Sequence, residues 1–339
     1  MPGKTASTAT IDIDGKKLQL SNLDKVYYPA VGFTKAQVID YYVRIAPAIL
    51  PHLAERPVTL KRYPEGVEGS YFYQKECPEY RPEWLDTAPV CSRSRGAAPA
   101  PKEHPGAGSS PESGRPADAF RNVNFCLVND LPSLVWVVNT ASIELHTSLS
   151  LGKDLLTPEL VVFDLDPGPP ATIVECAQVA LWLRQIFDGM GLQSFPKTSG
   201  SKGLQVYIPL NTPVAYERTK NFAHDQARLL EGRHPELVVS NMTRSLRQGK
   251  VLVDWSQNDH HKTTVCVYSL RAREHPTVSA PVQWPEVETT AAALGKHPDP
   301  GLLALETGQV IRRWQEFGDL FAPVLELKQE LPSDYDRWS

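Results

Sequence analysis

The sequence lacks the features of a secreted or membrane-spanning protein. None of its apolar runs approaches the roughly 20 residues that cross a bilayer. The N-terminal "MPGKTASTATIDIDG" has no apolar core of a secretory signal. The five cysteines are scattered and never spaced as C-x-x-C. We therefore expect a cytoplasmic protein with reduced cysteines, no disulfide framework and no structural zinc site.

The sequence also lacks an internal repeat and the G-x-x-x-x-G-K-[ST] loop of P-loop proteins. A chain of 339 residues that is 41% hydrophobic can form one large domain or two intimately packed ones. The net charge of −4 does not indicate a nucleic-acid partner, but it is uneven: Lys/Arg outnumber Asp/Glu by ten to seven in residues 1–75 and by twelve to seven in 197–275, whereas residues 276–339 have five against ten. These counts allow a basic groove, although alone they favour ordinary surface charge.

Helices and strands are both indicated, without strict alternation, which predicts an α+β fold. Capping boxes at Thr34/Gln37 and Thr172/Glu175 each begin a predicted helix, the second ending near Gly189 or Gly191. Residues 216–231 are also predicted to be helical, and the Pro/Gly/Ser-rich residues 91–120 to form a mobile loop. Strands are predicted at 204–210, 250–256 and 263–270, and residues 131–147 suggest a strand, a break and then a second strand or short helix ending at His146.

The segment "ELVVFDLDPG" (159–168) places two carboxylates at the end of a predicted buried strand. Asp164 and Asp166 are two residues apart, so their side chains point to the same face. Like charges at close range raise each other's pKa unless a cation lies between them, and oxygen ligands suit Mg²⁺ or Mn²⁺. D-x-D is also a short motif, and alone it fits an aspartate that caps a turn equally well.

Three further features support a metal centre that handles phosphates. Asp254 in "KVLVDWSQN" ends a second apolar strand, and three carboxylates on adjacent strands can hold two metals about 3.5–4 Å apart. The turn "KTSGSKG" offers backbone N–H groups and Lys202 to a phosphate. Basic residues in strand-like contexts would neutralise a triphosphate. Each feature also has a plain structural explanation, as a turn aspartate, a Gly/Ser turn or a solvated face.

Several long motifs together, in this order, resemble one known family. They are the segment from "SNLDKVYYPAVGFTKAQ" to "GSYFYQK", then "VFDLDPG", "TSGSKGLQVYIPL", "MTRSLRQGKVLVDWSQN" and "KTTVCVYSLR". From about Ser21 to about Pro285 the chain resembles the polymerase (primase-like) domain of bacterial ligase D, in the archaeo-eukaryotic primase superfamily. The resemblance implies mixed or antiparallel sheets flanked by helices. It implies a catalytic domain at 1–285, made of two intimately packed subdomains, and an acidic helical extension at 286–339 packed on the same domain.

The resemblance also implies roles for individual residues. Asp164, Asp166 and Asp254 would be the catalytic residues and the ligands of two Mn²⁺ or Mg²⁺ ions. The residues expected at the nucleotide are Lys61, Arg62, His146, Ser199, Lys202, Gln205, Arg244, Arg247 and Lys262. Those expected at DNA, including a 5′-phosphate, are Asn22, Lys25, Lys35, Tyr73 and Lys75. Gln205 is a departure, because the family usually has a histidine there, and a neutral amide cannot carry a proton or a charge.

The implied function is a DNA-repair primase-polymerase. It would add nucleotides, preferably ribonucleotides, to a primer 3′ end at short gaps or breaks that carry a 5′-phosphate. The 339 residues contain no K-x-D-G ligase motif, so we expect a free-standing, monomeric protein near the bacterial nucleoid that works with a separate DNA ligase and without a membrane. The alternatives are a non-catalytic module that bridges DNA ends, a metal-dependent phosphatase, and a primase that starts chains de novo.

Overall fold

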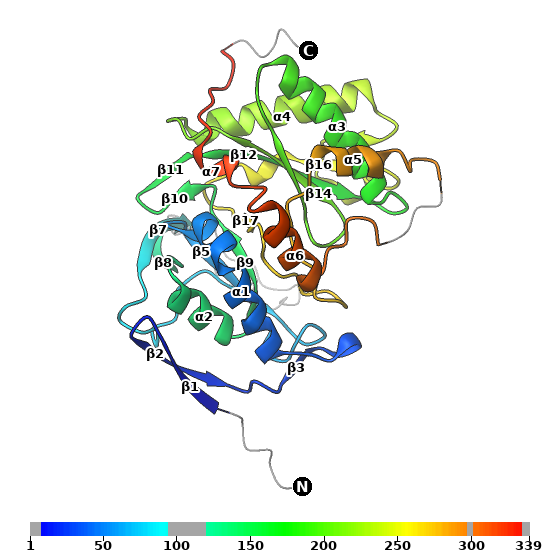
Figure 1. The fold of residues 1–339 in the computed structure, drawn as a ribbon. Coiled ribbons are helices and arrows are strands. Elements are labelled where there is room, and N and C mark those ends of the chain that lie inside the picture. Colours follow the sequence, from blue (N-terminus) through cyan, green and yellow to red (C-terminus); the bar gives the residue numbers. More distant parts are fainter. Residues whose placement is uncertain (1–7, 94–119, 297–300, 334–339) are drawn as a thin grey trace, which may run out of the picture.

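The computed structural model describes residues 8–93, 120–296 and 301–333, which form an α+β protein with two main sheets. In Figure 1 the five-stranded sheet with α3, α4 and α5 occupies the upper half of the molecule, and the six-stranded sheet with α1 and α2 the lower half. Each sheet has its own cluster of buried apolar residues. Among the described strands every pairing is antiparallel except one, β15 with β16.

The five-stranded sheet has the order β13-β14-β12-β16-β15. Its strands are β12 (Leu160–Pro167), β13 (Phe195–Thr198), β14 (Leu204–Pro209), β15 (Val238–Val239) and β16 (Val251–Asp254). Helices α3 (Ile173–Gly189) and α4 (Tyr216–Arg233) pack against β12, the central strand. Val161, Phe163 and Leu165 are fully buried in this half of the molecule, so β12 is anchored along most of its length.

The six-stranded sheet has the order β17-β9-β5-β8-β7, with β6 also paired to β5. Its strands are β5 (Val58–Arg62), β6 (Phe72–Gln74), β7 (Thr87–Arg93), β8 (Phe120–Cys126), β9 (Ser142–Thr147) and β17 (Thr264–Val265). Helices α1 (Lys35–Leu53) and α2 (Leu131–Asn139) pack on each other and belong to the same apolar core as this sheet. Strand β17 follows β16 of the other sheet in the chain and pairs with β9, so it ties the two halves together.

Smaller elements complete the fold. They are the hairpins β1 (Thr8–Ile13) with β2 (Lys16–Ser21), β3 (Val26–Tyr28) with β4 (Phe33–Thr34), and β10 (Ser150–Leu151) with β11 (Asp154–Pro158), and the short 3-10 helices η1 (Pro29–Val31), η2 (Arg244–Leu246) and η3 (Trp255–Gln257).

The C-terminal helices pack on both halves of the molecule. They are α5 (Trp284–Ala291), α6 (Thr307–Phe317) and α7 (Pro323–Glu326). Val287 is buried with the five-stranded sheet, whereas Val310 and Phe321 join the core beside α1. The carboxylate of Asp319 also bonds His52 of α1 at 2.8 Å. The segment after residue 285 is thus held by the cores of both sheets.

The structure confirms the helices that the two capping boxes predicted, but it corrects the prediction for residues 131–139. Both predicted capping boxes are confirmed, and α3 ends at Gly189 as expected. Residues 131–139, predicted as a strand, form helix α2 instead. Asp130 and Ser133 form a third capping box, and Pro132 lies in the first turn of the helix, where a missing N–H costs little. The apolar, β-branched residues that follow this capping box are also typical of a strand, so the sequence was interpreted as a strand.

Two further expectations are corrected. The predicted strand 263–270 forms a strand only at Thr264–Val265, with a further isolated bridge from Leu270 to Val278. Tyr268 has a positive φ of 65° that takes the chain out of the extended conformation between them. Residues 91–93 and 120 belong to the paired strands β7 and β8 rather than to a loop. The rest of the predicted mobile loop, residues 94–119, lies outside the described residues.

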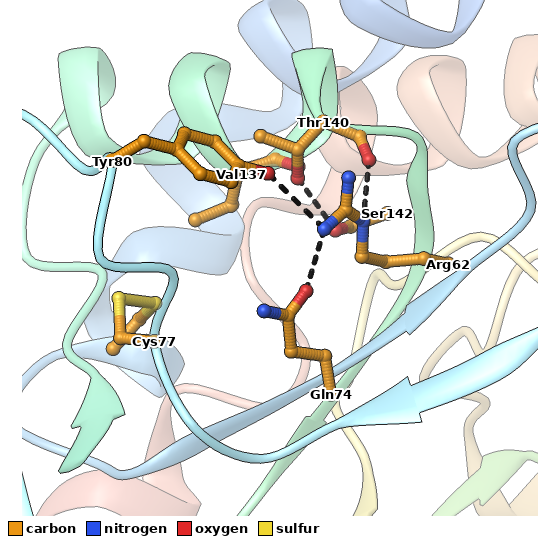
Figure 2. The surroundings of a disulfide bond; sticks show 8 residues. Arg62, Gln74, Cys77, Tyr80, Val137, Thr140 and Ser142 are labelled. Atoms are coloured by element: carbon orange, nitrogen blue, oxygen red, sulfur yellow. Dashed lines mark hydrogen bonds between the residues drawn. A yellow bond between two sulfur atoms is a disulfide. The ribbon is translucent and has the colours of Figure 1, made fainter.

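The expectation that every cysteine is reduced is wrong. Cys77, which follows β6, forms a disulfide with Cys126 at the end of β8. Figure 2 shows its surroundings, with Arg62, Gln74 and Tyr80 close by. The two cysteines are 49 residues apart in sequence, and the pairing of strands brings their Cα atoms to 4.9 Å. Sequence spacing carries no signal for such a contact.

None of the helices in the described residues is long and apolar enough to cross a membrane.

Candidate active site

The two aspartates of β12 and the one that ends β16 lie on adjacent strands. Strand β16 pairs antiparallel with β12 and places Asp254 directly opposite Asp164, with Asp166 two residues further along β12. On the other side of β12, strand β14 places Gln205 opposite Asp164. The structure therefore confirms that the strand of Asp254 lies beside the strand of the aspartate pair.

The carboxylates of these aspartates repel one another. Burial raises the pKa of Asp164, and the charges of Asp166 and Asp254 raise it further, while a hydrogen bond from Gln205 acts in the opposite direction. The pKa of Asp166 is also raised, by burial and by Asp254, although Arg247 and Arg271 oppose this. A bound cation would relieve the repulsion.

This repulsion predicts a stability effect in the protein without metal. A carboxyl group with a raised folded-state pKa stabilises the fold while it is protonated, and that contribution is lost as pH rises through the raised pKa. We therefore expect Asp164→Asn to raise the melting temperature in a chelator at pH 7.5 by a few degrees, or about 1–2 kcal/mol, and by less at pH 5. Scanning calorimetry of both proteins measures this. Asp188→Asn, at an exposed site on α3, is the control, and a gain that does not depend on pH would contradict the explanation.

The oxygen-rich donor set fits a hard divalent cation. Asp254 already accepts hydrogen bonds at Oδ1 from the N–H and hydroxyl of Ser256 and at Oδ2 from Gln257. Because a carboxylate has about four lone-pair sites, Asp254 keeps roughly one for a metal. Among the described residues, the three ligand-type side chains with atoms all within 4.8 Å of one another are Asp259, His260 and His261, so the aspartate triad is more open than this group. Asp164, Asp166 and Asp254 would hold the metal through hard oxygen ligands.

Asp164 lines a cavity of about 950 Å³ that the two sheets share. From the six-stranded sheet, Thr59 of β5, Tyr73 of β6 and His146 of β9 line it as well. Of the residues expected at nucleotide or DNA, the structure brings these together here: Tyr73, Lys75, His146 and Lys262. A single cavity thus brings Asp164 together with cationic and aromatic side chains.

Lys61 lies at the edge of this group. Its amine donates to the carboxylate of Glu144 at 3.3 Å and lies 4.4 Å from the ring centre of Tyr71. Burial lowers the pKa of Lys61, and Glu144 opposes that shift. His146 also bonds Glu144, at 2.9 Å, and burial lowers its pKa too. Glu144 therefore contacts two of the residues predicted at the nucleotide.

The 199–203 loop differs from its predicted role as a cradle of free N–H groups. The Oγ of Ser199 accepts the N–H groups of Ser201 and Gly203, and the N–H of Gly200 donates to Thr198. The N–H of Ser199 itself donates to the carbonyl of Gly203. These donors already have partners within the loop. Lys202 is exposed and lines a second cavity, of about 440 Å³.

The other predicted nucleotide residues lie apart from the main cavity. Arg62 points away from Lys61, because adjacent residues of a strand face opposite sides, and it bonds Thr140 and Gln74 (Figure 2). Arg247 lies close enough to Asp166 to lower its pKa, and its guanidinium donates to the carbonyl of Met242. Arg244 is exposed on η2. None of these arginines lines the 950 Å³ cavity in the described structure.

Three predicted DNA residues form a separate group at the start of α1. The N–H of Lys25 donates to the carbonyl of Asn22, and the N–H of Lys35 to the carbonyl of Lys25. The Lys25 amine bonds Glu65 at 2.7 Å, at a partly exposed site. Lys35 is buried and donates to the carbonyl of Ser21, and burial with the charges of Lys25 and Arg62 lowers its pKa to about 8. Lys25 is therefore the more accessible of the two lysines.

Sequence reasoning missed two residues of the site, Glu144 and Arg271. Arg271 lines the main cavity and donates to the carbonyl of Ser199 at 2.7 Å. Glu144 is two residues before His146 in "IELHT", so strand alternation was a usable signal for it. Arg271 is the last residue of the segment "KTTVCVYSLR", which resembles the family, but no role was expected for it.

Comparison with known proteins identifies the family of this chain. The family model of the LigD primase-polymerase domain matches residues 34–320. The multifunctional non-homologous end joining protein LigD of Mycolicibacterium smegmatis is 38% identical over 311 residues, covering 91% of this chain and 36% of that protein. The bifunctional LigD of Bacillus subtilis is 30% identical over 317 residues, covering 93% of this chain and 45% of that protein. The chain thus spans less than half the length of these curated relatives.

A solved structure shares the fold. The polymerase domain of Mycobacterium tuberculosis ligase D, in complex with DNA, matches with a TM-score of 0.77 at 35% identity, covering 92% of this chain and 99% of that one. The family model and the shared fold thus define a nucleotidyltransferase of the primase-polymerase class. The chain belongs to the LigD primase-polymerase domain family.

Proposed function

We propose that this chain extends a primer 3′ end by templated nucleotide addition at short gaps or breaks in DNA. The observation that carries the proposal is the register of β12 and β16, which sets Asp254 opposite Asp164 beside a cavity that cationic side chains also line. The cavity volume of about 950 Å³ lies within the range of small-molecule sites. The neighbour solved with DNA and the end-joining relatives support DNA as the partner.

Different side chains would bind the metal ions, the phosphates and the bases. Two divalent ions, held by the three aspartates, would lower the pKa of the primer hydroxyl and stabilise the leaving pyrophosphate. Lys61, Lys262 and Arg271 would offset the charge of the triphosphate, with Lys202 and Arg247 at the edges. Tyr73 is 56% exposed beside the cavity and offers a stacking surface that tolerates any base.

We further propose that the protein acts as a monomer at the bacterial nucleoid, in the cytoplasm. No K-x-D-G motif occurs in the 339 residues, so sealing of the nick needs a ligase activity outside them. A preference for ribonucleotides and the use of Mn²⁺ follow from the family resemblance and belong to the same proposal.

Extension of a short-gapped duplex tests this function. The substrate carries or lacks a 5′-phosphate, the buffer contains Mn²⁺ or Mg²⁺, and each nucleotide type is supplied separately. We expect templated extension, faster with ribonucleotides and with Mn²⁺. Gap binding without extension would instead indicate an end-bridging module. Release of phosphate without synthesis would indicate a phosphatase, and synthesis without a primer would indicate a primase.

Lys25→Ala is expected to abolish the preference for gaps that carry a 5′-phosphate. The Lys25 amine is partly exposed and is held by a carboxylate, Glu65, that a phosphate can replace as its partner. The ratio of extension rates on phosphorylated and unphosphorylated gaps measures the effect. Lys17→Ala, at an exposed lysine of β2 outside the group of Asn22, Lys25 and Lys35, is the matched control. An unchanged ratio in Lys25→Ala would remove this residue from the phosphate site.

A further inference from the structure

Glu144 is a carboxylate buried against the main cavity. It lies on β9, where its residue is 1% exposed. A buried charge is costly unless it is paired and hydrogen-bonded, and both of its oxygens are fully engaged. Oε1 accepts from the Lys61 amine at 3.3 Å, the Tyr63 hydroxyl at 3.3 Å and the N–H of Ala272 at 3.1 Å. These partners explain why the carboxylate stays charged.

The second oxygen of Glu144 binds two groups that line the cavity. Oε2 lies 2.9 Å from Nε2 of His146 and 3.3 Å from Nε of Arg271. The Arg271 contact is an ion pair without the alignment of a hydrogen bond, and within the described structure that Nε has no other partner. Together these contacts hold the pKa of Glu144 well below its usual range, against the opposing effect of burial. One carboxylate thus joins Lys61, His146 and Arg271.

These three residues come from separate parts of the chain. Strands β5 and β9 pair Lys61 with Glu144, and Arg271 arrives from the segment after β17. Arg271 also donates to the carbonyl of Ser199, so Glu144 is linked through it to the 199–203 loop. Fixing a lysine or arginine side chain costs conformational entropy, because several rotatable bonds become restricted. Two neighbouring cations also repel each other. Glu144 offsets both costs before any ligand arrives.

We propose that Glu144 is a positioning residue that fixes Lys61, His146 and Arg271 as one preorganised wall for the polyphosphate of the incoming nucleotide. This inference rests on the proposed polymerase function. Donors that are already in place need no rearrangement when charge develops at the phosphates. Glu144 has no direct role at DNA in this proposal, because Lys61, His146 and Arg271 are all proposed to contact the triphosphate.

A purely electrostatic role for Glu144 makes the opposite prediction. The carboxylate cancels one positive charge in the wall, so if charge alone mattered, neutralising it would tighten the binding of a triphosphate. If position matters, neutralising it releases Lys61 and Arg271, and binding weakens despite the gain in net positive charge. The sign of the change in nucleotide affinity therefore decides between the two.

The test uses Glu144→Gln and Glu144→Asp in the full chain. Glutamine keeps the shape and removes the charge, whereas aspartate keeps the charge and retracts it by one methylene. For both variants we expect the KM for the nucleotide on gapped DNA to rise about tenfold, which is the typical effect of losing one charged hydrogen bond. We expect kcat to fall by a smaller factor and the KM for the DNA to stay unchanged. Calorimetric titration with ATP and Mn²⁺ measures the same loss without DNA.

Asp319→Asn is the matched control. Asp319 also bonds a histidine, a tyrosine hydroxyl and a backbone N–H, namely those of His52, Tyr268 and Phe321, but it does not line the cavity. We expect it to lower thermal stability as Glu144→Gln does and to leave the nucleotide KM unchanged. If Glu144→Gln does not fold, Glu144→Asp decides, because it retains the buried charge.

The outcomes separate this inference from the proposed function. Extension by the wild type together with an unchanged or lowered nucleotide KM in the Glu144 variants would overturn the positioning role. A wild type that extends no primer would overturn the polymerase proposal instead. In that case the calorimetric affinity of the variants for ATP and Mn²⁺ still tests whether Glu144 positions the three side chains. An affinity equal to that of the wild type would refute the positioning role.

Discussion

Asp164→Asn is expected to lower the rate of primer extension by about a thousandfold or more, in line with the loss of a catalytic metal ligand or charge-stabilising group. An amide has nearly the shape of the carboxylate but no charge to attract a divalent ion. The binding of gapped DNA should change by less than about twofold, because the residues proposed for DNA, such as Lys25, belong to other elements. Single-turnover extension with Mn²⁺ and fluorescence anisotropy with labelled gapped DNA measure the two quantities.

Asp166→Asn should behave like Asp164→Asn, because both carboxylates lie on the same face of β12. Asp188→Asn is the control, since that exposed carboxylate of α3 forms only a long ion pair with Arg184. Equal losses of DNA binding and of extension would mean that the aspartates shape the binding surface, and the metal-centred role would then be wrong.

The catalytic strand of the site could be predicted because its signal is local. Alternation along a strand puts Asp164 and Asp166 on one face, and an apolar run ending in a carboxylate indicated the strand of Asp254. The order of strands in the sheet is not a local property. Asp254 lies opposite Asp164 because of the register of β12 and β16. The sequence alone could not predict that these two strands are neighbours.

Alternation along a strand also determines which way other side chains of the site face. Lys61 and Arg62 are adjacent on β5, so they could not both face the nucleotide, and Arg62 turns toward Thr140 and Gln74. Glu144 shares a face with His146 for the same reason. The disulfide of Cys77 with Cys126 could not be predicted this way, because distant segments meet there only after the sheet has formed.

Gly203→Ala is expected to have the second large effect, on both folding and extension. A Cβ atom at Gly203 would lie 2.0 Å from the carbonyl oxygen of Leu165, the residue between the two aspartates of β12. That oxygen belongs to a central strand paired on both sides, so it cannot move aside as a flexible side chain would. We expect a loss of at least about 3 kcal/mol of stability and, in any protein that folds, extension reduced at least about a hundredfold by displaced aspartates.

Gly232→Ala separates this clash from a general effect of replacing glycine. Gly232 lies near the end of α4, and a Cβ there would meet nothing within 4 Å. Alanine is the better helix former, so this variant should gain up to about 1 kcal/mol and extend primers at the wild-type rate. Thermal unfolding and single-turnover extension of both variants give the comparison. Wild-type stability and extension in Gly203→Ala would show that the loop does not pack on β12 between the aspartates, and the proposed link from the 199–203 loop to the catalytic strand would fail.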